Sequence, residues 1–137
     1  MKEIFSTHQR MEILDDIILR NGSIGVVSTS KRLHLSKGLV SKYFDILEKY
    51  KILKRVNTKY IVVNSAITKS IRILMNIKRI DLENFNKKFI KGVGLYGSCA
   101  KGNNTAESDI DIWVRIDDID RETLAEFTSN VTRMNEK

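Results

Sequence analysis

Leu95-Tyr96-Gly97-Ser98-Cys99-Ala100-Lys101-Gly102, followed after five residues by Ser108-Asp109-Ile110-Asp111-Ile112-Trp113-Val114, is the stretch that decides the fold. The apolar run over residues 93–96 predicts a strand that enters a turn at Gly97 and Ser98. Because glycine has no Cβ, the backbone at Gly97 can approach a ligand closely, and the N–H groups that follow open a short helix. The sequence therefore predicts a turn suited to a phosphate group.

Asp109 and Asp111 lie in a second predicted strand. Apolar and polar residues alternate over residues 109–116, which is the period of a β-strand. The alternation predicts that the two aspartates share one face, with Cα atoms roughly 6 to 7 Å apart. Two carboxylates this close repel unless a cation lies between them, so the pair is a candidate site for Mg²⁺.

Together, the two motifs resemble the signature of the DNA polymerase β type nucleotidyltransferase superfamily, in particular its minimal members. The resemblance covers residues 93–116: Gly-Ser, a short helix, a glycine, and Ser-Asp-x-Asp on a strand. It implies a nucleoside triphosphate substrate, ATP by expectation, and two Mg²⁺ ions held by Asp109 and Asp111 as catalytic metal ligands. The nucleotide-binding residues that it implies are Gly97, Ser98, Lys101, Gly102 and Ser108. Lys101 stands where such motifs commonly have arginine, so the positive charge is kept without the planar guanidinium that can form two parallel hydrogen bonds.

Positive charge is concentrated in the first half of the chain. Residues 1–80 contain 16 Lys and Arg against 6 Asp and Glu, whereas residues 81–137 contain 8 against 11. Nine of the basic residues lie between Lys31 and Lys59. A surface that binds a polyanion requires such a concentration, although a solvated lysine-rich surface is the alternative.

Residues 6–64 have the pattern of three helices and a hairpin. Ser6 and Gln9 have capping-box spacing before a helix that ends at residues 21–22, residues 25–33 form a second helix, and Ser36 caps a third that ends near Tyr50. Residues 52–56 and 59–63 read as a hairpin. This order resembles the winged helix-turn-helix domains of bacterial and archaeal transcription regulators. It implies contacts to double-stranded DNA from Lys37, Ser41, Lys42, Lys54, Arg55 and Lys59. A helical domain for protein contacts is the alternative.

The remaining segments complete a two-domain α+β or α/β prediction: a winged helix-turn-helix over residues 1–64, a linker helix and connection over 65–86, and the nucleotidyltransferase-like domain over 87–137. The apolar helix over residues 65–80 either packs between the domains or forms a homodimer seam. Asp120 is expected to cap a final helix, with Asp117 and Asp118 in a solvated turn rather than on a metal. The single cysteine, Cys99, is expected to be a buried hydrophobe. Cysteine usage and the lack of a long apolar run predict a cytoplasmic protein without a membrane segment.

A third carboxylate completes the metal site in the resembled superfamily, on a later strand. Residues 121–137 are expected to be helical, and Glu122, Glu126 and Glu136 do not match that position. Three interpretations stay open: a truncated N-terminal part of a longer nucleotidyltransferase, inactive alone; a DNA-binding regulator with an inactive nucleotide-sensing domain; or a vestigial pocket beside a DNA-binding domain. The small expected sheet favours the first. The superfamily leaves the nucleotidyl acceptor open, a protein partner included.

Overall fold

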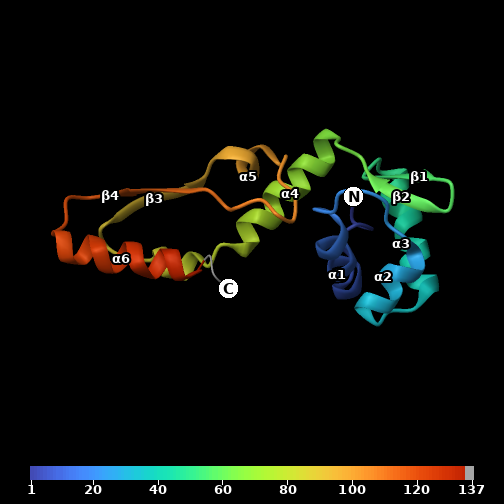
Figure 1. Ribbon diagram of the computed structural model, residues 1–137, viewed down its shortest axis with the longest axis horizontal. Helices are drawn as coiled ribbons and strands as arrows, with labels where there is room; N and C mark the ends of the chain where they lie inside the picture. The colour runs from blue at the N-terminus through green and yellow to red at the C-terminus, as the bar shows by residue number, and fades with distance from the viewer. Residues whose placement is uncertain (135–137) are drawn as a thin grey trace.

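The computed structural model describes the backbone of residues 1–134 and the side chains of residues 1–131. Over this range the chain forms six α-helices, one 3-10 helix and two separate two-stranded antiparallel sheets (Figure 1). This mixture of helices and strands agrees with the mixed α and β class that the sequence predicts. Because both sheets are antiparallel, the architecture is α+β rather than α/β.

Three helices and a hairpin form the first unit. They are α1 (His8–Ile17), α2 (Val26–Leu33), α3 (Lys37–Lys49), β1 (Leu53–Val56) and β2 (Lys59–Val62). Ser36 caps α3 as predicted, since its side chain accepts a hydrogen bond from the Leu39 N–H at 3.2 Å. The predicted cap of α1 is wrong by one residue. Thr7 accepts from the Arg10 N–H, while the Ser6 hydroxyl donates to the Glu3 carbonyl.

Fully buried side chains from α1, α3 and the hairpin form the core of this unit. Tyr43 and Phe44 are its largest members, and the Phe44 ring meets the Tyr60 ring edge-on at 5.0 Å between centroids. Ile24 pairs with Tyr60 through two backbone hydrogen bonds of 2.7 and 2.8 Å, so the segment before α2 is tied to the hairpin. Burial of these apolar side chains supplies the main driving force for folding.

Helix α4 (Ala66–Arg79) joins the first unit to the rest of the chain (Figure 1). Ser65 caps it by accepting from the Thr68 N–H at 3.2 Å. Ile71 and Met75 are buried in the core of the first unit, whereas Leu74 and Ile77 are 53% and 44% exposed. The homodimer seam expected on this helix stays a prediction.

The second sheet lies beyond α4. A 3-10 helix, η1 (Leu82–Phe85), precedes β3 (Ile90–Leu95), α5 (Gly97–Lys101), β4 (Ile112–Ile116) and α6 (Arg121–Met134). Strands β3 and β4 pair in a register that sets Val93 opposite Val114. The Phe127 ring of α6 meets the rings of Phe85 and Phe89 edge-on, at 6.2 and 5.7 Å, which holds α6 beside the two strands.

The turn between β4 and α6 has the structure that the sequence predicts. Asp120 caps α6 by accepting from the Thr123 N–H at 2.8 Å, and this hydrogen bond lowers the pKa of the Asp120 carboxyl. Asp117 forms an exposed ion pair with Lys91 at 3.1 Å. Asp117 and Asp120 are therefore used as an ion-pair partner and a helix cap.

A buried pair of asparagines fixes α5 and the following loop to α4. The Asn76 amide donates to the Cys99 carbonyl at 3.0 Å and to the Asn104 side chain at 2.9 Å, and it accepts from Asn104 at 2.9 Å. Both side chains are at most 2% exposed. The loop that leads to Asp109 and Asp111 is therefore anchored to the linker helix.

Replacing Asn76 by alanine is expected to lower the free energy of unfolding by about 3 kcal/mol, because three buried hydrogen bonds are lost at about 1 kcal/mol each. Urea unfolding followed by circular dichroism measures this loss. Replacing the exposed Asn84, whose amide bonds only to Asp81, is the matched control with an expected change within about 0.5 kcal/mol. Equal stability of the two variants would contradict the anchoring role.

Within residues 1–134, none of the helices combines the length and the apolar character that crossing a lipid bilayer requires.

Candidate functional site

Gly97 makes the turn between β3 and α5. Its φ of +67° lies in the left-handed region, which the backbone of a residue with a side chain rarely adopts. A Cβ built on Gly97 would lie 2.5 Å from the Asp111 Oδ2 atom. The Asp111 carboxylate therefore packs directly against the backbone of the turn, and only glycine leaves it that space.

Backbone contacts place both aspartates beside this turn. The Tyr96 N–H donates to the Asp111 carbonyl at 3.0 Å, and the Cys99 thiol donates to the Asp109 carbonyl at 3.2 Å. The predicted strand over residues 109–116 is too long, because β4 begins at Ile112. Since β3 ends at Leu95 and the chain turns at Gly97, residues 109–111 face this turn and α5 rather than a strand. The common face of the two carboxylates stays a prediction, with the Asp109 side chain exposed and that of Asp111 half-buried.

Cys99 lies on the buried side of α5 and is fully inaccessible to solvent, as the sequence predicts. Burial raises the pKa of its thiol, against a smaller lowering from the adjacent Ser98 hydroxyl. The thiol is thus a hydrogen-bond donor to the loop that carries Asp109. It is not a reactive group.

The other predicted nucleotide ligands are Lys101, Gly102 and Ser108. Gly102 ends α5 with a φ of +67°, and a Cβ there would overlap the Lys69 carbonyl of α4. Lys101 is exposed in the last turn of α5. The Ser108 hydroxyl accepts from the Thr105 N–H at 2.9 Å and so shapes its own loop. The structure brings Gly97, Ser98 and Asp111 together and gives Gly102 a packing contact with α4, while the ligand roles of all these residues stay predictions.

Two exposed aromatic residues near the turn were missed by sequence reasoning. Tyr96 is 53% exposed and Trp113 is 48% exposed. The Trp113 ring covers Gly94, where a Cβ would lie 2.7 Å from three indole atoms. The signal in the sequence is Gly92-x-Gly94 on β3, which the register sets beside Trp113 on β4. A half-exposed ring over the strand that leads into the Gly97 turn offers a surface for stacking a base.

Asp109 and Asp111 are the acidic residues next to this turn in the chain, and their convergence on one metal ion stays a prediction. Among the side chains that the structure describes, no group of three or more His, Cys, Asp and Glu could hold a metal ion. Glu122 and Glu126 lie on α6, and Glu136 falls outside the described residues. The Asp111 carboxylate oxygen beside the turn nevertheless has the chemistry that Mg²⁺ prefers, with water completing its coordination.

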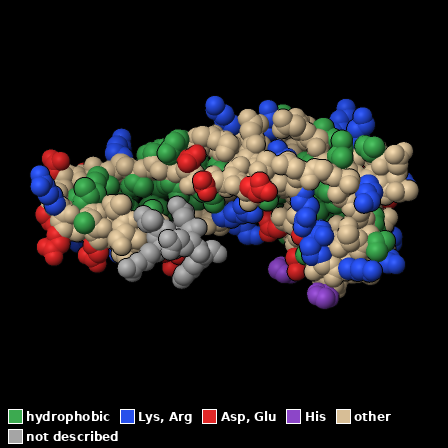
Figure 2. Space-filling view, in the orientation of Figure 1, with side chains coloured by type: hydrophobic (Ala, Val, Ile, Leu, Met, Phe, Trp, Pro, Cys, Tyr) green, Lys and Arg blue, Asp and Glu red, His purple; other side chains and the backbone are tan. Residues whose placement is uncertain are grey.

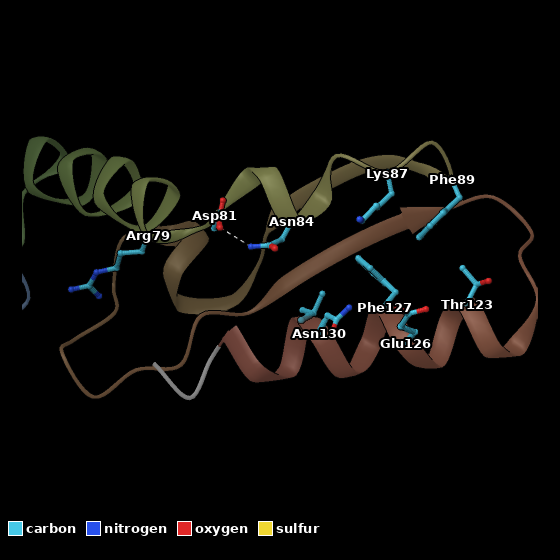
Figure 3. A pocket seen from close by; sticks show the side chains of 10 residues that line it. Arg79, Asp81, Asn84, Lys87, Phe89, Thr123, Glu126, Phe127 and Asn130 are labelled. Atoms are coloured by element: carbon cyan, nitrogen blue, oxygen red, sulfur yellow. Dashed lines mark hydrogen bonds between the residues drawn. The ribbon is translucent and has the colours of Figure 1, made fainter.

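A cavity of about 750 Å³ lies on the α6 side of this part of the chain (Figure 3). Phe89 and Phe127 point toward each other at one end of it, and Asp81 and Asn84 are joined by a hydrogen bond of 2.7 Å at the other. The residues that line it are Arg79, Asp81, Asn84, Lys87, Phe89, Thr123, Glu126, Phe127, Asn130 and Val131. It contains none of the predicted site residues, so the candidate site is the turn and not this cavity.

The predicted DNA contacts lie on the surface of the first unit. Lys37 and Lys42 on α3 and Lys54, Arg55 and Lys59 on the hairpin are exposed, and Ser41 is half-buried. Arg55 lies 6.0 Å above the Tyr60 ring and donates to the Asn57 carbonyl at 3.2 Å. Figure 2 shows Lys and Arg side chains gathered over this unit, with Asp and Glu side chains at the far end of the chain near the β4–α6 turn.

Comparison with known proteins gives one family. The model of the family described as "Polymerase beta, Nucleotidyltransferase" matches residues 77–137. Neither the curated proteins nor the solved structures gave a match. The matched range contains the Gly97 turn and both aspartates, and it supports the nucleotidyltransferase superfamily for this part of the chain.

Proposed function

We propose that the chain is a nucleotidyltransferase that binds an Mg²⁺-nucleoside triphosphate at the Gly97 turn, and that its first unit is a winged helix-turn-helix that binds double-stranded DNA. The observation that carries the enzymatic part is the contact between the Asp111 carboxylate and the Gly97 backbone. It sets a carboxylate oxygen, the kind of ligand that Mg²⁺ prefers, beside the glycine turn for which the sequence predicts a phosphate.

Each residue at the turn has a distinct role in this proposal. Asp109 and Asp111 hold Mg²⁺, which when bound supplies Lewis-acid charge to the phosphoryl oxygens. The absence of a side chain at Gly97 leaves room for the Asp111 carboxylate beside the backbone, and the Ser98 hydroxyl and N–H bind oxygens of the triphosphate. Lys101 offsets phosphate charge. Trp113 and Tyr96 offer a stacking surface for the base.

A nucleotide sensor without catalysis is the second candidate. It is favoured by the carboxylate count, because two acidic residues lie at the turn and no third completes the set within residues 1–131. Nucleotidyl transfer needs the attacking hydroxyl activated as well as the triphosphate bound. Binding of Mg-ATP without release of pyrophosphate, with candidate acceptors present, would support the sensor.

The DNA-binding part rests on charge and placement. Six exposed cations lie on α3 and the β1–β2 hairpin, which are the elements that a winged helix-turn-helix presents to the major groove and the flanking backbone. Lys49 is paired with Glu3, and the other five are the predicted DNA contacts Lys37, Lys42, Lys54, Arg55 and Lys59. No carboxylate forms an ion pair with these five among the described side chains. They are therefore free to meet phosphates.

Binding of ATP is expected to require Mg²⁺ and to weaken at least about tenfold in Asp109→Asn, because one of two ligand charges is removed. Isothermal titration calorimetry in Mg²⁺ and in EDTA measures this dependence. Glu107→Gln removes an exposed carboxylate from the same loop and serves as the matched control. Equal ATP affinity in Mg²⁺ and EDTA, or in Asp109→Asn and the unmodified chain, would refute the metal site.

A further inference from the structure

A second cavity, of about 440 Å³, lies where the first unit meets α4 and the end of α5. Three cationic side chains line it, Arg20 from the segment that follows α1 and Lys69 and Arg72 from α4, and its lining contains no carboxylate. Asn64, Asn103 and Thr105 add neutral polar groups. A recess lined by cations and hydrogen-bond donors, with no acid, has the composition of an oxyanion site.

Arg72 is a buried cation without a counterion. It is 8% exposed, and its Nε and Nη1 atoms donate to the carbonyls of Ile18 at 2.9 Å and Gly102 at 3.3 Å. No carboxylate pairs with it among the described side chains. Burial lowers the pKa of its guanidinium. These carbonyls lie at the C-terminal ends of α1 and α5 and offset part of the guanidinium charge, but no formal negative charge balances it, which is costly in a buried site.

Lys69 adds a second uncompensated charge. It lies three residues before Arg72 on α4, a spacing that puts both side chains on one helix face. Its ammonium has no hydrogen bond or ion pair to any side chain that the structure describes. Arg20, in contrast, is paired with Asp16 at 3.1 Å. The unbalanced charge of the cavity therefore comes from Lys69 and Arg72.

We infer that this cavity binds the phosphate group of a small phosphorylated ligand, at a site distinct from the Gly97 turn. A tetrahedral phosphate has acceptors enough for the Arg72 fork, the Lys69 ammonium and the surrounding amides together. Arg72 donates to the last turns of both α1 and α5, through Ile18 and Gly102. A phosphate bound there lies at the connection between the basic first unit and the Gly97 turn. A small ligand fits better than a duplex, because the central guanidinium is buried whereas the cations on α3 and the hairpin are exposed.

The test uses the full chain in EDTA, which leaves the proposed Mg-ATP site without its metal. Inorganic phosphate and AMP are titrated by calorimetry, with the melting temperature as a second measurement and chloride at equal ionic strength as the reference. Lys69→Gln should weaken binding of both at least tenfold, and Arg72→Lys should weaken it as well, since a point charge replaces the fork. Lys88→Gln, which removes an exposed charge elsewhere, should bind like the unmodified chain. Lys69 is suited to the test because its atoms nearest to Gly102 belong to the backbone, which Lys69→Gln leaves in place.

Several outcomes would overturn the inference. The first is a melting temperature that phosphate raises no more than chloride does. The second is an affinity for phosphate and AMP that Lys69→Gln leaves unchanged. The third is a chain that binds neither phosphate nor AMP but needs Lys69 to bind duplex DNA. The result is independent of the Gly97 turn, because phosphate should bind equally well to Asp111→Asn. Loss of Mg-ATP binding in Asp111→Asn with phosphate binding intact would separate the two sites.

Discussion

Replacing Gly97 by alanine is expected to weaken Mg-ATP binding by about a hundredfold, equivalent to about 2.7 kcal/mol. Two effects combine. The added Cβ would lie 2.5 Å from the Asp111 Oδ2 atom, so the carboxylate must move away from the proposed metal position. Alanine also disfavours the φ of +67° by about 1 to 2 kcal/mol, so the turn itself changes shape.

The chain provides its own reporter for this experiment. Trp113 is the single tryptophan, and its half-exposed ring covers Gly94 on the strand that leads into the turn. Its fluorescence should change on addition of Mg-ATP to the unmodified chain and stay constant in Gly97→Ala. Gly38→Ala is the control, because a Cβ at Gly38 meets no atom within 4 Å and the residue lies within α3, far from the turn in sequence. Urea unfolding of Gly97→Ala separates loss of binding from loss of folding. A folded Gly97→Ala protein that binds Mg-ATP normally would refute the role of the turn.

Local signals in the sequence predicted most of the secondary structure. Ser36 and Asp120 cap the helices that follow them, as predicted, because a short oxygen-bearing side chain can satisfy a free N–H at a helix start. The hairpin and the burial of Cys99 were also predicted correctly. These features depend on a few neighbouring residues, so the sequence contains them directly.

Features that depend on contacts distant in sequence were not predicted. Alternation over residues 109–116 indicated one long strand, but residues 109–111 bond to Tyr96 and Cys99 instead. Nothing in the periodicity of α4 showed that Arg72 would reach the ends of two other helices, or that Asn76 would pair with Asn104. The cavity around Arg72 could therefore be found only once the two units were seen together.

Replacing Lys37, Lys42 and Arg55 by alanine is expected to weaken duplex binding and to flatten its salt dependence. If about six cations meet phosphates, affinity of the unmodified chain falls roughly a thousandfold between 50 and 200 mM salt. Removing three of these contacts should reduce that fall to about fortyfold, because each phosphate contact contributes about 0.9 to the logarithmic slope. Fluorescence anisotropy with a labelled duplex at several salt concentrations measures both slopes.

A matched triple variant distinguishes a specific surface from general attraction by a basic protein. Lys2, Lys87 and Lys88 are exposed and lie outside α3 and the hairpin, so their replacement by alanine removes the same charge from other places. If long-range attraction dominates, the two triple variants should lose affinity equally, since net charge acts on both alike. If α3 and the hairpin form the interface, the control should keep nearly the full salt slope, because counterion release requires direct contact with phosphates. Equal slopes in the two variants would refute the winged-helix interface while leaving the Gly97 turn untouched.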